Sequence, residues 1–246
     1  MKRSLFIFFV TLGNILFPKN TYAEKEKDLV EITKYYKTVT FLASDNTYIL
    51  NNNKLSTTTE ITEEEYNNSN TLIRTNSSTP IETTFKKMTA TITANGNYYR
   101  YKNRLVWKNI PKVRSYDIIG IGFQTSVKIK GNTYFSQNYC VVNSGCTTTT
   151  TNSPKIFANG AGTSFKIPTG DLYQLDQTFY FDVEKNTQYT IINQTINGDY
   201  AHATSSISLA NSKKYTMDFD KIELDTSVVN NYDTISSAQA TWSGTW

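Results

Sequence analysis

Closely spaced carboxylates are the residues of this chain with the clearest potential for acid–base chemistry. Asp182 and Glu184 form one pair, separated by a single residue. The second group lies within eight residues and consists of Asp218, Asp220, Glu223 and Asp225. Two carboxylates flanking a glycosidic bond do the chemistry in most glycoside hydrolases, so a glycan-active hydrolase is one functional alternative. The other interpretation is structural, because acids that alternate with Phe219 are typical of a strand with one solvated face.

Other catalytic and metal-binding signals are weak. The second carboxylate group lacks the glycine and the bidentate glutamate of a calcium-binding loop. His202 is the only histidine, and the chain has no nucleophile-elbow, zinc-protease, phosphate-loop or dinucleotide-binding motif. We therefore predict no catalytic residues, no cofactor and no metal, and we interpret His202 as a structural residue of a strand.

The two cysteines, Cys140 and Cys146, are the only ones in the chain. In an exported protein an even number of cysteines predicts a disulfide, which here would close a small loop through Asn143, Ser144 and Gly145. A metal site would need further ligands that the sequence does not offer nearby. The spacing also differs from that of a redox-active pair.

A basic segment stands out between Lys86 and Lys130. It holds ten basic side chains and one acid, Asp117, a net charge of +9, whereas residues 24–85 and 131–246 each carry a net charge of −4. The candidate binding residues are Arg100, Lys102, Arg104, Lys108, Lys87 and Arg114. They predict a face for an anionic wall polymer or glycan. The alternative is a solvated outer face whose charges are balanced by the acidic flanks.

The local charge does not extend to the whole chain. Without residues 1–23 the net charge falls from +4 to about +1, because that segment holds three basic residues and no acid. Nucleic acid is therefore not expected as a partner. Trp242 and Trp246, near Tyr232, offer a second binding hypothesis, since aromatic side chains can stack on sugar rings. A last strand that closes the core is the competing interpretation.

The basic residues need a hairpin to align them. Residues 84–94 and 97–108 alternate in polarity around Asn95-Gly96, a strong hairpin turn signal. A turn at these two residues pairs Ile92 with Tyr99 and Thr91 with Arg100. The basic side chains then point outward. The side chains expected to point inward are Tyr99, Tyr101, Leu105 and Trp107.

The remaining signals indicate strands. Tyr, Thr, Ile and Phe are abundant, and turn residues recur between about ten to twelve expected strands, which predicts an all-β, antiparallel, jelly-roll-like β-sandwich. The sandwich is expected over residues 80–246, preceded by an arm or first strands with a linker over 24–79. Thr62 and Glu65 form a capping box that predicts one small helix in the arm. Asn197-Gly198 is expected to be a turn, and Gly120 and Gly122 a bulge or a close backbone approach.

The N-terminus has the form of a secretory signal over residues 1–23. Lys2 and Arg3 precede an apolar run, Leu5 to Phe17, which is too short to span a bilayer as a helix. We therefore expect a secreted or extracellular protein, either released or retained at the cell surface, with no transmembrane span in the mature chain. A membrane-active β-toxin is a further alternative, although residues 83–108 carry too many charges to cross a membrane easily.

The segment RLVWKNIPKVRSYDIIGIGF, residues 104–123, is similar to part of uncharacterised exported proteins of low-GC Gram-positive bacteria. The resemblance covers these 20 residues only. It implies an exported β-rich protein and assigns neither an activity nor functional residues. The sequence as a whole favours a secreted, non-enzymatic binding protein, and the oligomeric state is not specified.

Overall fold

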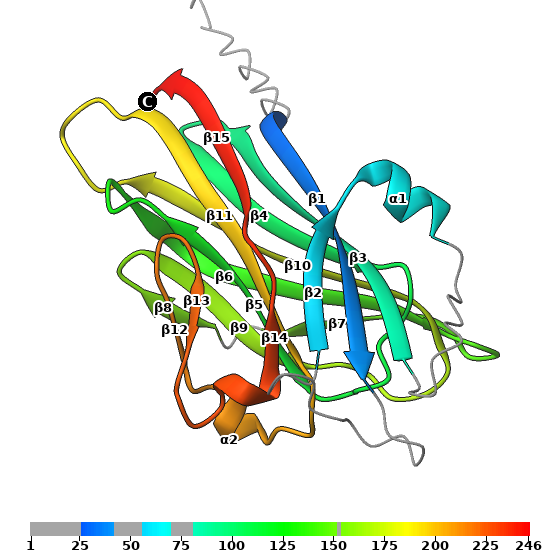
Figure 1. The fold of residues 1–246 in the computed structure, drawn as a ribbon. Coiled ribbons are helices and arrows are strands. Elements are labelled where there is room, and N and C mark those ends of the chain that lie inside the picture. The colour runs from blue at the N-terminus through cyan, green and yellow to red at the C-terminus, as the bar shows by residue number, and fades with distance from the viewer. Residues whose placement is uncertain (1–25, 42–55, 70–80, 152–153) are drawn as a thin grey trace, which may run out of the picture.

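The computed structural model describes residues 26–41, 56–69, 81–151 and 154–246. Two antiparallel sheets pack face to face, and nearly all regular structure is strand (Figure 1). The predicted all-β sandwich is therefore confirmed. The predicted signal at residues 1–23 and most of the predicted linker lie outside the described residues. Within the described ranges, no helix is long and apolar enough to cross a membrane.

The larger sheet has seven strands and includes both the basic hairpin and the N-terminal strands. In spatial order it consists of β2 (Ser56–Ile61), β1 (Lys27–Phe41), β3 (Ile81–Asn95), β4 (Tyr98–Trp107), β10 (Leu172–Lys185), β6 (Val127–Val141) and β7 (Gly145–Thr151). Since β1 pairs with β3 from Lys27 to Phe41, the first strands are part of this sheet.

The smaller sheet forms the second layer. In spatial order it consists of β14 (Tyr232–Thr234), β11 (Ile192–Ala203), β5 (Tyr116–Phe123), β9 (Gly160–Lys166) and β8 (Lys155–Phe157), and β15 (Ala238–Thr245) also pairs with β11. The core lies between the layers, where Leu105 and Phe181 from the larger sheet are buried with Ile121 and Ile196 from the smaller one.

Short elements complete the fold. These are α1 (Glu63–Asn68), α2 (Leu209–Ser212), β12 (Tyr215–Met217), β13 (Ile222–Leu224) and η1 (Val229–Asn231). The helix expected from the capping box is α1, whose N-cap Thr62 accepts a hydrogen bond of 3.1 Å from the backbone N–H of Glu65.

The β3–β4 hairpin has the expected faces but not the expected register. Ile92 pairs with Tyr101 and Thr93 with Arg100, so the predicted pairing was wrong by two residues. The turn lies at Gly96-Asn97, with Gly96 at φ +60°, where glycine suits the first central position of a two-residue turn. Because side chains alternate with a period of two, a shift of two residues leaves each on its predicted face.

The predicted turn at Asn197-Gly198 was wrong. Both residues lie inside β11, an inner strand of the smaller sheet, and Gly198 pairs with β5 on one side and β15 on the other. The glycine is used for packing. A Cβ at Gly198 would lie 2.7 Å from the side-chain oxygen of Asn103, whose amide donates to the carbonyl oxygens of Gly120 and Asp199.

The two glycines in β5 mark a close backbone approach, one of the two predicted possibilities. The β12–β13 hairpin lies across the outer face of the smaller sheet (Figure 1). A Cβ at Gly122 would lie 2.0 Å from the carbonyl oxygen of Phe219, and one at Gly120 would lie 2.8 Å from the sulfur of Met217. These glycines therefore let the hairpin seat directly on the sheet.

Candidate functional site

Arg100 is the most fully engaged of the predicted binding residues. Its guanidinium donates to both oxygens of Asp182, at 2.8 and 3.2 Å, and to Glu26 at 2.7 Å. The hydrogen bonds that Arg100 donates to Asp182 raise the pKa of Arg100 above its usual value. Asp182 is also one of the two carboxylates considered above for glycan hydrolysis. Its charge is neutralised by Arg100 in this ion pair. Its neighbour Glu184 binds Lys128 at 3.2 Å.

Three further predicted residues are also engaged. Arg104 forms an ion pair with Asp176, which raises the pKa of Arg104. Lys108 donates to backbone carbonyl oxygens at the end of α1 and lies over the Tyr66 ring, and Arg114 donates to a backbone carbonyl oxygen. Four of the predicted binding residues are therefore already engaged by groups of the same chain.

Lys102 and Lys87 complete the predicted set, and Lys102 lies on the same outward face as the arginines. With Arg100 and Tyr180 it lines a shallow hollow of about 430 Å³ that also includes Glu26 and Asp28. Two cations and two carboxylates share this hollow, so its charge is balanced. Lys87 lies on β3 opposite Val106 of β4 and Tyr35 of β1.

The second carboxylate group is on the β12–β13 hairpin and its flanks. Asp218 accepts hydrogen bonds from the backbone N–H of Phe219 at 2.7 Å and from Asn159 at 3.3 Å, which lower its pKa. Asp225 accepts from the backbone and hydroxyl of Ser227. Among the described residues no group of three or more acids, cysteines or histidines is placed to hold a metal ion.

His202 belongs to a buried polar network, as its structural interpretation required. Asp117 accepts hydrogen bonds from His202 Nδ1 at 2.9 Å, from the Tyr200 hydroxyl and from the backbone N–H of Ala203 at 2.9 Å. All of these groups lie between or within the sheets, and the Trp107 ring packs 5.1 Å from the His202 ring. These hydrogen bonds join β5 and β11 of the smaller sheet, and the Trp107 ring of the larger sheet packs against them.

A buried lysine extends the polar interior. Lys86 is 0% exposed, its Nζ donates to Thr38 at 3.0 Å and it lies over the Trp107 ring, and burial lowers its pKa. Thr38 in turn bonds Thr58 at 2.6 Å, and Thr58 donates to Asp233. Side chains from β3, β1, β2 and β14 are thereby joined across the sandwich.

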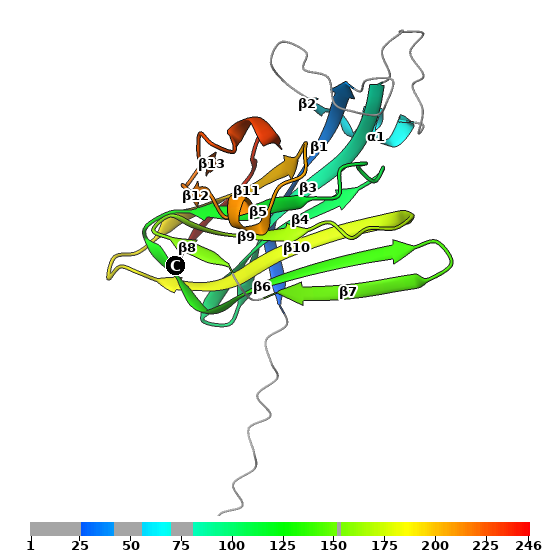
Figure 2. The same ribbon diagram turned by 90° about the horizontal axis from the view of Figure 1, so that it is seen from below.

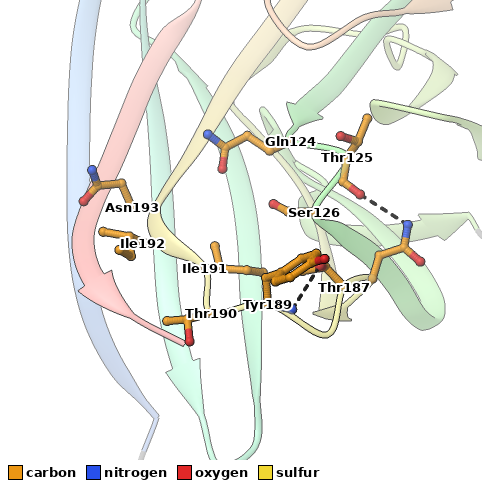
Figure 3. Close-up of a pocket in the computed structure, with 10 residues that line it drawn as sticks. Gln124, Thr125, Ser126, Thr187, Tyr189, Thr190, Ile191, Ile192 and Asn193 are labelled. Carbon is orange, nitrogen blue, oxygen red and sulfur yellow. Dashed lines mark hydrogen bonds between the residues drawn. The ribbon is translucent and has the colours of Figure 1, made fainter.

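An open, uncharged pocket lies at one end of the sandwich, between two loops. Its volume is about 590 Å³, and Figure 3 shows the side chains that line it. One loop joins β5 to β6 and the other joins β10 to β11. The lining residues are Gln124, Thr125, Ser126, Asn186, Thr187, Tyr189, Thr190, Ile191, Ile192 and Asn193. None of them is charged.

Backbone contacts fix the two loops relative to each other. The backbone N–H of Asn186 donates to the carbonyl oxygen of Ser126 at 2.8 Å. The side-chain amide of Asn186 donates to the backbone carbonyl oxygen of Thr125 at 3.2 Å. The backbone groups of Ile191 and Trp246 exchange two hydrogen bonds, of 3.0 and 2.9 Å. The pocket walls are therefore held by the sandwich and not by side-chain charges.

Two large side chains at the pocket remain open to solvent. Tyr189 is 81% exposed and Ile192 is 71% exposed. The β11–β15 register shifts between Ile192 and Gln194, and the intervening Asn193 has φ +63°. Asparagine tolerates this left-handed conformation, and bulges of this kind redirect neighbouring side chains.

The C-terminal tryptophans border this end of the sandwich. Trp246 packs edge-on against Tyr99 with ring centroids 4.5 Å apart, and Trp242 lies 5.2 Å from the same ring. Both pack against the core cluster. They therefore close the edge of the sandwich, and Tyr189 is the aromatic residue that faces solvent at the pocket.

Sequence reasoning missed this pocket because its lining comes from two loops that are far apart in the chain and from the start of β11 at Ile192. The available signal was a polar segment that nevertheless contains two large apolar or aromatic side chains, Tyr189 and Ile192. Neither a protein-family model nor a curated protein sequence matches the chain. The function is therefore argued from the geometry alone.

Asp199 supplies a prediction about pH. Its buried carboxyl lies beside Ser237, and burial raises its pKa to about 8. Ser237 Oγ also lies 2.7 Å from the Asp220 carbonyl oxygen, so a protonated Asp199 can donate to Ser237 while Ser237 donates to Asp220. Since the unfolded carboxyl titrates near 3.8, stability should fall as pH rises from about 4 to about 8.

Thermal melts across that range test the assignment. The Asp199→Asn variant has no carboxyl group to titrate at this position, so its stability should not show this decrease. The stability of the variant relative to wild type should therefore increase with pH up to about pH 8. Asp218→Asn is the matched control, because the pKa of Asp218 is lowered and its contribution is lost only when the pH drops below about 4. Parallel profiles for wild type and Asp199→Asn would contradict the assignment.

Proposed function

We propose that this protein is an exported, non-enzymatic binding protein that recognises an uncharged part of a glycan in the pocket between the β5–β6 and β10–β11 loops. The observation that carries the proposal is the lining of that pocket: amides and hydroxyls without a charged side chain, beside the exposed ring of Tyr189. Export is supported by the signal-like residues 1–23.

The chemistry of the lining matches a sugar. Each sugar hydroxyl both donates and accepts hydrogen bonds, and the amides of Gln124 and Asn193 and the hydroxyls of Ser126 and Thr190 offer both functions. An exposed tyrosine supplies a rigid apolar face with a polar tip, which suits the C–H face of a sugar ring. The pocket volume is also within the usual range for a small-molecule site, about 300–1,000 Å³.

Replacing Tyr189 by alanine should weaken glycan binding about tenfold, or ~1.4 kcal/mol, because the stacking surface is removed. The probe is a panel of neutral oligosaccharides of hexoses and N-acetylhexosamines, measured by titration calorimetry. Tyr173→Ala is the matched control, since Tyr173 is also exposed but lies outside the pocket. Equal affinities of Tyr189→Ala and wild type for every bound glycan would contradict the proposal.

Salt dependence separates this site from the second candidate, an anionic polymer on the outer face of the larger sheet. Lys102 favours that candidate, because among the described residues it takes part in no ion pair. Binding to the uncharged pocket should be equal in about 50 and about 500 mM salt, whereas binding through Lys102 should weaken with salt and with Lys102→Gln. Dextran sulfate is a suitable anionic probe.

A further inference from the structure

Strand β7 forms an open edge of the larger sheet. Its sequence is Gly145-Cys146 followed by five threonines, Thr147–Thr151. It pairs with β6 on one side and is the outermost strand on its side of the sheet (Figure 2). Residues 145–150 are all exposed. This edge needs an explanation, because open edges are sites at which further strands can add.

Cys140 and Cys146 form the predicted disulfide, and this bond identifies which backbone groups of β7 are free. Cys140 and Cys146 are directly opposite each other with their Cα atoms 4.0 Å apart, which is the spacing of a pair that does not exchange backbone hydrogen bonds. Such pairs alternate along an antiparallel ladder, and the β6–β7 register has no shift. The N–H and C=O groups of Thr148 and Thr150 therefore point away from β6, towards the open side.

The usual protections of an edge strand are absent from β7. It has no charged residue, no proline and no bulge, the devices that keep strands from pairing between molecules. The opposite edge of the sheet differs, because β2 carries Glu60 in an ion pair of 2.9 Å with Lys34. The disulfide also holds β7 against β6 in one register, so the open edge stays extended.

We propose that a second copy of this protein pairs with this edge, β7 against β7 in antiparallel orientation, to form one sheet across two molecules. A two-fold axis makes the contact self-complementary. With the two-fold axis at Thr149, Thr147–Thr151 of one copy face the same threonines of the other. No like charges meet, and cross-strand threonine pairs bond through their hydroxyls. The strongly β-forming threonines also suit an extended partner.

The geometry of such a dimer has two consequences. Only one strand from each molecule makes contact, which buries less than the roughly 1,200 Å² of a stable interface, so the dimer should dissociate in the micromolar range or above. In an antiparallel pair the two β6 strands also run in opposite directions. The β5–β6 loops, and with them the two pockets, then lie at opposite ends of the joined sheet.

Sedimentation velocity of the purified protein from about 10 to about 500 μM tests the proposal. Wild type should shift from monomer to dimer within this range. Thr148→Pro removes an outward N–H and leaves the bonds to β6 intact, so it should remain monomeric. The Thr148→Lys/Thr150→Lys variant should also remain monomeric, because four like charges would meet across the axis.

The control is Thr57→Lys, which adds a charge to an exposed threonine of β2, the other edge strand. It should dimerise like wild type. Circular dichroism and thermal melts check that every variant is folded. A wild type that is monomeric throughout the range would overturn the proposal, and so would a dimer that persists in the folded Thr148→Lys/Thr150→Lys variant.

Discussion

Replacement of Asp117 by alanine is expected to lower the free energy of unfolding by about 3 kcal/mol or more. The carboxylate is fully buried and accepts hydrogen bonds from His202, Tyr200 and the backbone of Ala203. Alanine leaves three buried donors without a partner, and each costs about 1–3 kcal/mol. Urea unfolding followed by tryptophan fluorescence measures the loss, since Trp107 packs against His202.

Two variants calibrate this prediction. Tyr200→Phe removes one of the three donors and keeps the carboxylate bonded to the others, so its cost should be a fraction of that of Asp117→Ala. Asp182→Ala removes a partly exposed carboxylate that binds Arg100, for which a cost of about 0–1 kcal/mol is expected. Similar losses for Asp117→Ala and Asp182→Ala would show that the buried network contributes little.

The second large effect is expected at Gly122. A Cβ there would lie 2.0 Å from the carbonyl oxygen of Phe219 and 2.6 Å from that of Asp218. Both are backbone atoms of the β12–β13 turn, so the hairpin must move away from the sheet. We expect Gly122→Ala to cost about 1–3 kcal/mol, as overpacking typically does, with faster amide hydrogen exchange across residues 215–224.

Gly120→Ala is the graded comparison for this prediction. The nearest atom to its Cβ would be the sulfur of Met217, at 2.8 Å, which is part of a flexible side chain. Met217 can adopt another rotamer, so Gly120→Ala should cost less and leave the exchange of the hairpin nearly unchanged. If Gly120→Ala were as damaging as Gly122→Ala, backbone contact would not be the cause.

The faces of the basic hairpin were predictable because alternation is a local property. Arg100 and Lys102 were placed outward, and Tyr101 and Leu105 inward, as the structure has them. The register of the hairpin was not predictable, because a turn at Asn95-Gly96 and a turn at Gly96-Asn97 both keep the same side chains on each face. The turn expected at Asn197-Gly198 failed for another reason: this glycine accommodates the side chain of Asn103, which is distant in the sequence.

The candidate site was harder to predict from the sequence than the hairpin. The count of +9 described the segment from Lys86 to Lys130 correctly, but the partners that balance it lie far along the chain. Asp182 and Asp176 reach Arg100 and Arg104 only because β10 pairs with β4. The pocket is built from two loops of common polar residues, and only the sandwich brings them together.

The first described strand and the last one meet in the finished fold. The hydroxyl of Tyr36 in β1 donates a hydrogen bond of 2.6 Å to the carbonyl oxygen of Ser236, just before β15, and Tyr99 of β4 packs against Trp246. During synthesis, Tyr36 must therefore wait until 200 further residues have been added. Such distant pairings fold slowly. A chain still bound to the ribosome therefore lacks the contacts between its first and last described strands, and the core can close only once β15 has been made.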